Sequence, residues 1–217
     1  LGRLLDPDTG TAAARGRIED WFVQLGELIA ALHNQASSWQ VPDGFRRHTL
    51  DADGLMGRDP FWGRFWEYPA LTEPQRALLA RVRGRLHAWL DALPRTPETW
   101  SLIHADLHAH NLLVHDQTLA VIDFDDAGFG WHPYDLAVAL RQYQGEPAFG
   151  YLRDALLRGY RRRRPLPDAV AAQIPTFILI RRLASMGWLM QRPELGEVLA
   201  PDEIDRLCRD VTVFLDS

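Results

Sequence analysis

The middle of this 217-residue chain changes its hydrophobic period, and that change limits the folds it can adopt. Between residues 100 and 124, short apolar runs alternate with polar turns, as in brief β-strands. On both sides, apolar residues recur at the spacing of amphipathic helices, over 18–34, 72–93, 133–143, 147–162, 168–190 and 201–215. The pattern predicts a mainly α fold with a small β insert at 99–130, folded as one compact unit.

A second irregular stretch, residues 37–71, is rich in proline and glycine and has no sustained period. We expect it to be loop-rich. It contains an aromatic cluster at 61–66, with Trp62 and Trp66. This cluster is interpreted as packing for the loops, and a cage for a cationic substrate is the alternative.

Composition excludes several classes of protein. A net charge of -5 and a pI near 5.9 argue against a broad nucleic-acid-binding surface. The single cysteine, Cys208, cannot form a disulfide within the chain, which fits a reducing compartment. No secretory pattern opens the chain, and no apolar run approaches the roughly 18 residues that span a bilayer. We therefore expect a cytoplasmic protein without nucleic-acid or membrane partners, and the oligomeric state stays open.

The densest polar chemistry lies around the predicted β insert. His104, Asp106 and Asn111 follow one apolar run, and Asp123 follows another. Phosphoryl transfer needs a carboxylate to orient or deprotonate the attacking hydroxyl, and oxygen ligands for magnesium between the phosphates. Magnesium prefers carboxylate and amide oxygens over imidazole or thiolate. These residue types therefore fit a phosphotransferase centre.

The same residues resemble the catalytic core of aminoglycoside phosphotransferases, choline kinases and related small-molecule kinases, which share the protein-kinase fold. His104, Asp106 and Asn111 match the H-x-D-x-x-x-x-N pattern, and Asp123 stands where protein kinases have the aspartate of D-F-G. The resemblance implies that Asp106 is the base, that His104 braces the loop, and that Asn111 and Asp123 bind Mg²⁺ with ATP or GTP as donor. Asp135 resembles the buried aspartate that holds the catalytic loop in these families.

Two departures from protein kinases favour the small-molecule branch. Asp125 occupies the position of the D-F-G glycine, and no A-P-E-type segment follows. Asp125, Asp126 and Trp66 are candidate substrate-binding residues, because extra carboxylates suit an acceptor that carries an amine. The expected acceptor is a small hydroxyl compound such as an aminoglycoside or amino-alcohol, and a protein Ser/Thr hydroxyl remains an alternative.

The parts that clamp the nucleotide phosphates are absent from the sequence. Kinases of this type use a Gly-rich loop and a lysine on a strand of the N-terminal lobe. This chain has no lysine, it begins at Leu1, and its first methionine is Met56. We expect residues 1–217 to form the C-terminal, helical lobe of a kinase-like fold, with the N-terminal nucleotide lobe missing.

Two other functions remain open. A zinc-dependent hydrolase would use the His/Asp cluster of His104, Asp106, His108, His110 and His115. That hypothesis leaves Asn111 and Asp123 without a role, and the histidines at 108, 110 and 115 are interpreted as surface or loop residues. An inactive kinase-like binding module is the second alternative.

Overall fold

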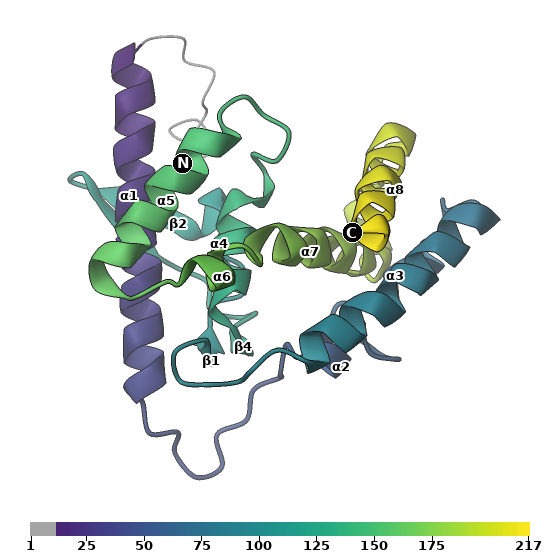
Figure 1. The fold of residues 1–217 in the computed structure, drawn as a ribbon, viewed down its shortest axis with the longest axis horizontal. Helices are drawn as coiled ribbons and strands as arrows, with labels where there is room; N and C mark the ends of the chain where they lie inside the picture. Colours follow the sequence, from purple (N-terminus) through teal and green to yellow (C-terminus); the bar gives the residue numbers. More distant parts are fainter. Residues whose placement is uncertain (1–11) are drawn as a thin grey trace. The chain divides into compact units, whose positions relative to one another are not determined.

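A computed structural model describes residues 12–217 (Figure 1). These residues form two compact units. The first unit combines the described part of residues 1–47 with residues 96–174. The second unit combines residues 48–95 with residues 175–217. The hydrophobic pattern had predicted one compact unit. Residues 48–95 instead share a core with the C-terminal residues, a long-range pairing that local periodicity does not reveal.

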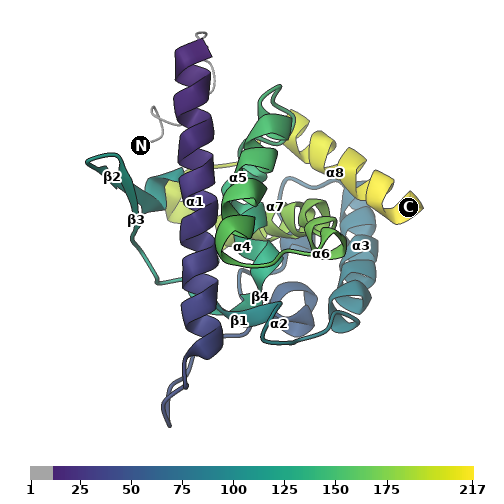
Figure 2. The same ribbon diagram turned by 60° about the vertical axis from the view of Figure 1, so that its left-hand side comes forward.

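The first unit is built on two long helices, α1 (Ala12–Ser38) and α5 (Phe149–Arg163), which pack side by side (Figures 1 and 2). Two glycines allow this close approach. A Cβ atom on Gly26 would lie 2.1 Å from the carbonyl oxygen of Leu156, and one on Gly159 would lie 1.9 Å from that of Val23. Because backbone fills the space on both sides, larger residues would force the helices apart.

The β insert of the first unit consists of two antiparallel pairs. β1 (Trp100–Ile103) pairs with β4 (Gly128–Trp131), and β2 (Leu112–His115) pairs with β3 (Thr118–Val121). A 3₁₀ turn, η2 (Ala109–Asn111), leads into β2. The insert agrees with the expected region at 99–130. β4 was not predicted, because Gly128 and Gly130 interrupt its apolar alternation.

Helix α4 (His132–Arg141) begins directly after β4, and its residues 132–140 are all buried. A helix that is buried on every side can carry polar groups only where they find partners. α4 carries two such groups, His132 and Asp135. The remaining helix of this unit is the short α6 (Asp168–Ala171).

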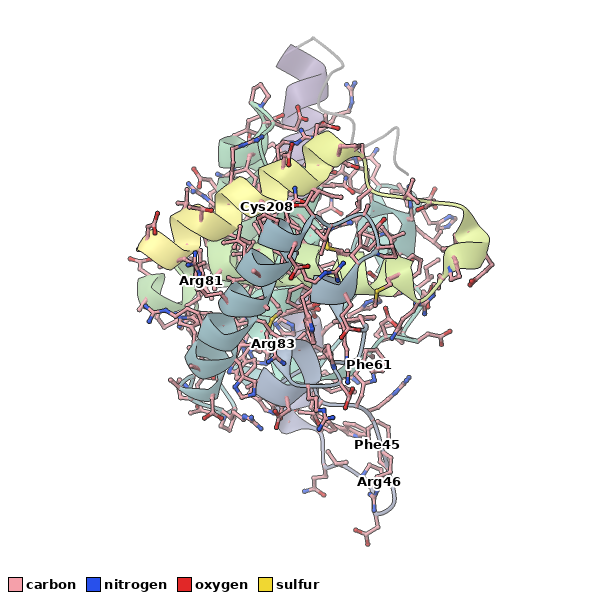
Figure 3. The ribbon with its side chains drawn as sticks, turned by 90° about the vertical axis from the view of Figure 1, so that its right-hand side faces the viewer. Phe45, Arg46, Phe61, Arg81, Arg83 and Cys208 are labelled. Atoms are coloured by element: carbon pink, nitrogen blue, oxygen red, sulfur yellow. The ribbon has the colours of Figure 1, made fainter. Side chains whose placement is uncertain are left out.

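The second unit is helical. It contains α2 (Ala52–Met56), α3 (Glu73–Asp91), α7 (Ile174–Met190), α8 (Pro201–Asp216) and the 3₁₀ turns η1 (Phe65–Glu67) and η3 (Pro193–Leu195). α3 and α8 pack against each other (Figure 3). The start of α3 is a capping box: the Thr72 N–H donates to Gln75 Oε1 over 2.9 Å, and the Gln75 N–H donates to Thr72 Oγ1 over 3.4 Å.

The aromatic cluster at 61–66 lies in the second unit. Trp62 is 3% exposed and Phe65 is fully buried, and the Arg181 guanidinium lies 4.8 Å from the Trp62 ring. Trp66 is half-buried, with Arg83 4.6 Å from its ring (Figure 3 labels Arg83). The burial of Trp62 and Phe65 supports the interpretation that this cluster packs the loops.

Residues 168–190, predicted as one helix, form the separate helices α6 and α7. Pro175 lies in the first turn of α7, where a missing N–H costs nothing; inside a continuous helix it would remove a hydrogen bond. Within the described residues, the stretch 168–190 is long and apolar enough to qualify as a membrane span, contrary to expectation. Half of that window is buried inside the protein, and the core helix of a globular domain passes the same test.

Candidate active site

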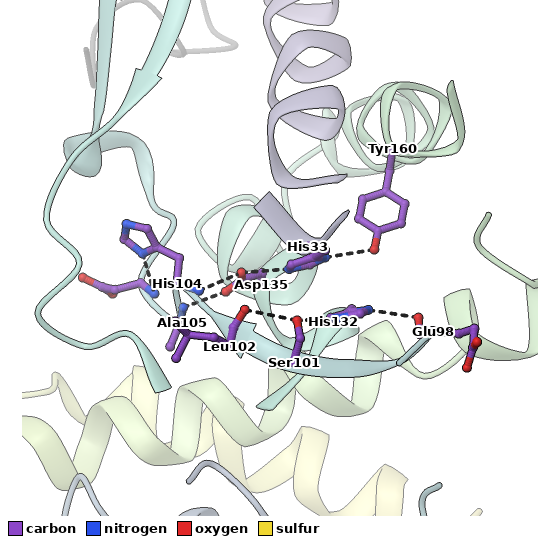
Figure 4. Close-up of polar contacts among 10 residues, drawn as sticks. His33, Glu98, Ser101, Leu102, His104, Ala105, His132, Asp135 and Tyr160 are labelled. Atoms are coloured by element: carbon purple, nitrogen blue, oxygen red, sulfur yellow. Dashed lines mark hydrogen bonds and ion pairs between the residues drawn. The ribbon is translucent and has the colours of Figure 1, made fainter. Parts of the chain in front are cut away.

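The loop after β1, residues 104–108, carries Asp106 and is here called the Asp106 loop. It is tied to the buried Asp135 of α4. The Asp135 carboxylate accepts the N–H of His104 over 3.0 Å and the N–H of Ala105 over 2.7 Å (Figure 4). Ala105 has a left-handed backbone with φ of 67°, an unusual conformation for a residue with a side chain. The buried carboxylate thus holds a strained turn immediately before Asp106.

Asp135 is supported by a helix far away in the sequence. Nε2 of His33, on α1, donates to Asp135 Oδ2 over 3.1 Å, and His33 is fully buried. Nδ1 of His33 shares a 2.9 Å hydrogen bond with the hydroxyl of Tyr160 on α5. Burial raises the pKa of Tyr160, so this hydroxyl stays protonated. The α1 and α5 pair thus supports the Asp106 loop through Asp135.

A second histidine completes this buried network. His132 stacks on His33 with ring centroids 4.2 Å apart, and its Nδ1 donates to the Glu98 carbonyl over 3.0 Å (Figure 4). Burial, together with a smaller effect of the neighbouring His33, lowers the pKa of His132 to about 2, so the ring is neutral. With its proton on Nδ1, Nε2 accepts the hydroxyl hydrogen of Ser101 over 2.9 Å.

The Asp106 side chain is 18% exposed and is oriented by two residues. The Asn111 amide nitrogen donates to the Asp106 carbonyl over 2.8 Å and to its Oδ2 over 2.9 Å. Nε2 of His108 lies 3.1 Å from the same Oδ2, while its Nδ1 accepts the His110 N–H over 3.2 Å and caps η2. Because the Asn111 nitrogen is directed at Asp106, its amide oxygen is the atom available to a cation.

Asp123 begins the second polar segment, residues 123–126, here called the Asp123 segment. It follows β3 at an exposed position and has a left-handed backbone with φ of 65°. The Ile122 N–H donates to the Asn111 carbonyl over 3.0 Å, next to the Leu112–Val121 pair of the β2–β3 ladder. The hairpin therefore brings Asn111 and Asp123 to the same end.

His104 connects the two segments. Its Nε2 donates to the Ile122 carbonyl over 3.1 Å, and its Nδ1 accepts the Asp106 N–H over 3.3 Å. One imidazole thus bridges the backbone of the Asp106 loop and the residue before Asp123. These two hydrogen bonds would let His104 brace the Asp106 loop against the end of β3.

The donor set suits magnesium better than zinc. Asn111 and Asp123 offer amide and carboxylate oxygens, the ligands that Mg²⁺ takes alongside water and phosphate. Within residues 12–217, no group of three or more His, Cys, Asp or Glu side chains is arranged to hold a metal ion. His115 is 90% exposed and pairs with Asp116 at the surface. The proposed zinc cluster of histidines therefore does not assemble in the described part of the chain.

The candidate substrate residues are distributed over both units. Asp125 is exposed, and its carbonyl accepts a hydrogen bond from Arg47; Asp126 is half-buried. Trp66 belongs to the second unit and Asp125 and Asp126 to the first. His33 and Arg47 were not singled out as site residues, and His108 was named only as a candidate zinc ligand. In the sequence, His33 could have been noticed only because a polar residue stands at a position of the helix where the pattern calls for an apolar one.

Comparison with known proteins gives the family. The family described as "Phosphotransferase enzyme family" matches residues 2–172. A homoserine kinase of Rhodospirillum rubrum is 34% identical over 177 residues, which cover 78% of this chain and 50% of that protein. The chain spans about half the length of the curated relatives it matches.

Solved structures agree. A microcompartment-associated aminopropanol kinase is similar with a TM-score of 0.73 and 33% identity, over 89% of this chain and 59% of that one. An amicoumacin kinase in complex with AMP-PNP and Ca²⁺ is similar with a TM-score of 0.71 and 26% identity, over 91% and 59%. The resemblance inferred from the His104–Asn111 pattern and Asp123 is thereby confirmed, and the chain belongs to the phosphotransferase enzyme family.

Proposed function

We propose that this chain carries the catalytic and metal-binding part of a kinase that transfers the γ-phosphate of ATP to a hydroxyl group of a small molecule. The observation that supports the proposal most is the Asp106 carboxylate, held by the Asn111 amide over 2.9 Å beside the end of the hairpin that carries Asp123. A base, an amide ligand and a carboxylate ligand thus converge from two adjacent loops. Phosphoryl transfer requires this combination.

In the proposed reaction, the acceptor hydroxyl oxygen attacks the γ-phosphorus, the bond to the β-phosphate oxygen breaks, and ADP leaves. Asp106 Oδ1 or Oδ2 takes the hydroxyl proton, and Asn111 and His108 keep the carboxylate in a fixed orientation. The amide oxygen of Asn111 and the carboxylate of Asp123 would hold Mg²⁺. The ion, when bound, neutralises charge that develops on the phosphate oxygens.

His104 and Asp135 act by positioning. Asp135 fixes the two backbone N–H groups before Asp106, and His104 joins that loop to the residue before Asp123. Precise placement of reacting groups supplies much of the rate of such reactions. We therefore expect both residues to affect turnover without contacting the substrate.

The acceptor class follows from the relatives and from charge. Homoserine and aminopropanol, named in two similar kinases, each carry a hydroxyl and an amine. Asp125 and Asp126 add carboxylates next to Asp123, and a cationic amine suits such surroundings. We propose an amino-alcohol or aminoglycoside as acceptor, with Asp125, Asp126 and Trp66 as substrate-binding candidates, and a cytoplasmic location.

We also propose that residues 1–217 are the C-terminal lobe of the enzyme. The described residues form helices and one small β insert, and the sequence contains no lysine to clamp the phosphates. Two relatives, one of them the homoserine kinase of Rhodospirillum rubrum, are about twice as long as the stretch they share with this chain. A nucleotide-binding lobe outside these residues would supply the clamp.

The test is a screen of the full-length protein for ADP release with Mg-ATP or Mg-GTP and a panel of amino-alcohols, aminoglycosides and Ser/Thr peptides. We expect Mg²⁺-dependent transfer to a small amine-bearing hydroxyl compound. Transfer to peptides alone would favour a protein kinase. Tightly bound zinc with hydrolysis in place of transfer would favour the hydrolase, and nucleotide binding without any transfer would favour an inactive module.

A further inference from the structure

The loop that follows α1, residues 39–47, is anchored against the strand that follows the Asp123 segment. The rings of Trp39 and Phe45 lie 4.9 Å apart, and Phe45 meets Phe129 of β4 at 6.4 Å, nearly perpendicular (Figure 3 labels Phe45). Gly44, with φ of 82°, allows the turn that brings Phe45 to this position. Contacts between three aromatic rings thus fix the loop just before Arg47.

Arg47 uses this placement to grip the Asp123 segment. Its Nη2 donates to the carbonyl of Phe124 over 3.0 Å, and its Nη1 donates to the carbonyl of Asp125 over 3.1 Å. The planar guanidinium fork can hold two acceptors at once in a defined orientation. One side chain from 77 residues away therefore binds two consecutive carbonyls, and the Phe124 carbonyl also accepts the Ala127 N–H over 3.1 Å.

This grip reaches the Asp123 side chain through one peptide group. The Phe124 carbonyl and the Asp125 N–H belong to the same peptide and point in opposite directions, because the bond is trans and planar. The Asp125 N–H donates to Asp123 Oδ1 over 3.4 Å. Arg47 thus holds one side of the peptide while the other side orients the Asp123 carboxylate.

From this arrangement we infer that Arg47 is a positioning residue that orients Asp123 for its metal ion. The inference rests on the proposed function, in which Asp123 is a magnesium ligand. Groups that orient a metal ligand typically change metal affinity about 10- to 100-fold when they are lost. Arg47 is exposed, so its loss leaves the core of the unit unchanged.

The test compares Arg47→Met with Arg46→Met in the full-length protein. Arg46 is a matched control, since it is an adjacent exposed arginine whose side chain donates to the carbonyl of its own neighbour, Phe45. Two quantities are measured: Mn²⁺ affinity in the presence of AMP-PNP by calorimetry, and the Mg²⁺ concentration for half-maximal transfer. For Arg47→Met we expect both to weaken about tenfold, with an unchanged KM for the acceptor.

A second variant, Arg47→Lys, covers the case in which Arg47→Met fails to fold. A lysine ammonium cannot form the planar fork, so we expect an intermediate metal affinity. Wild-type metal dependence in the folded Arg47 variants would overturn the inference. A wild-type protein without any Mg²⁺-dependent transfer would overturn the proposed function instead. In that case, amide exchange of residues 123–126 still decides the role of Arg47, because faster exchange in Arg47→Met supports it and unchanged exchange refutes it.

Discussion

The Asp106 loop and the Asp123 segment carry the two halves of the proposed site, and they are held in opposite ways. The Asp106 loop is held from the protein interior: Asp135 binds its backbone, and His33 binds Asp135, and both residues are fully buried. The Asp123 segment is exposed at residues 123–125 and is held from outside by Arg47. The difference indicates a rigid base and a metal ligand whose orientation depends on surface contacts.

The largest predicted effect on the free energy of unfolding comes from Asp135, which supports the Asp106 loop. Asp135→Ala leaves the N–H groups of His104 and Ala105 and the His33 ring without their acceptor. Removing one partner from a buried polar cluster costs about 3–5 kcal/mol. We expect that loss in the free energy of unfolding, measured with urea. Asp135→Asn, which keeps one acceptor oxygen, should lose less, and a cost below about 1 kcal/mol for Asp135→Ala would contradict the buried support.

The next effect concerns the close contact between α1 and α5, the two helices that carry His33 and Tyr160. Gly26→Ala places a methyl group against the Leu156 carbonyl, so we expect a loss of about 1–3 kcal/mol in the free energy of unfolding. Gly16→Ala is the matched control on the same helix, because nothing lies within 4 Å of its Cβ position. It should stabilise slightly through helix propensity. Equal behaviour of the two variants would mean that the helices do not need this close approach.

A smaller effect concerns pH. The folded pKa of His132, about 2, lies below its unfolded value near 6.5, so the unfolded chain binds more protons between these pH values. The contribution of His132 is therefore complete above pH ~6.5 and falls by about 1.4 kcal/mol per pH unit below it. The free energy of unfolding, measured with urea between pH 7 and 5, should depend less steeply on pH in His132→Gln than in the wild type. An unchanged slope would mean that His132 is not buried as a neutral ring.

The smallest effect belongs to the Asp123 segment. Arg47→Met should change the free energy of unfolding by no more than about 0.5 kcal/mol, as exposed substitutions usually do, while it weakens metal binding. Thermal or urea unfolding of the metal-free protein measures the first quantity. A stability loss as large as that of Asp135→Ala would erase the contrast between the two regions.

Local sequence identified the residues of the proposed site more readily than the residues that hold them. Asp106, Asn111 and Asp123 were chosen from residue type and spacing on two neighbouring loops. Asp135 was found because it resembles a family feature. These four residues lie in one stretch of the chain, 106–135, whose short motifs are informative in a single sequence.

The supporting residues were missed for a physical reason. His33 contacts Asp135 across 102 residues, and Arg47 contacts the Asp123 segment across 77, so neither pairing leaves a periodic trace. The division into two units likewise depends on residues 48–95 joining the C-terminal helices. β4 was missed because glycines weaken its strand pattern.

The central claim is that Asp106 is the base of a phosphotransferase, and its most direct test is the single-turnover rate of Asp106→Asn in the full-length protein. Asp116→Asn, an 89% exposed aspartate in the β2–β3 turn, is the matched control. We predict that Asp106→Asn lowers the transfer rate about 10²- to 10⁴-fold with nucleotide binding retained, while Asp116→Asn transfers like the wild type. A rate for Asp106→Asn within about twofold of the wild type would contradict the account.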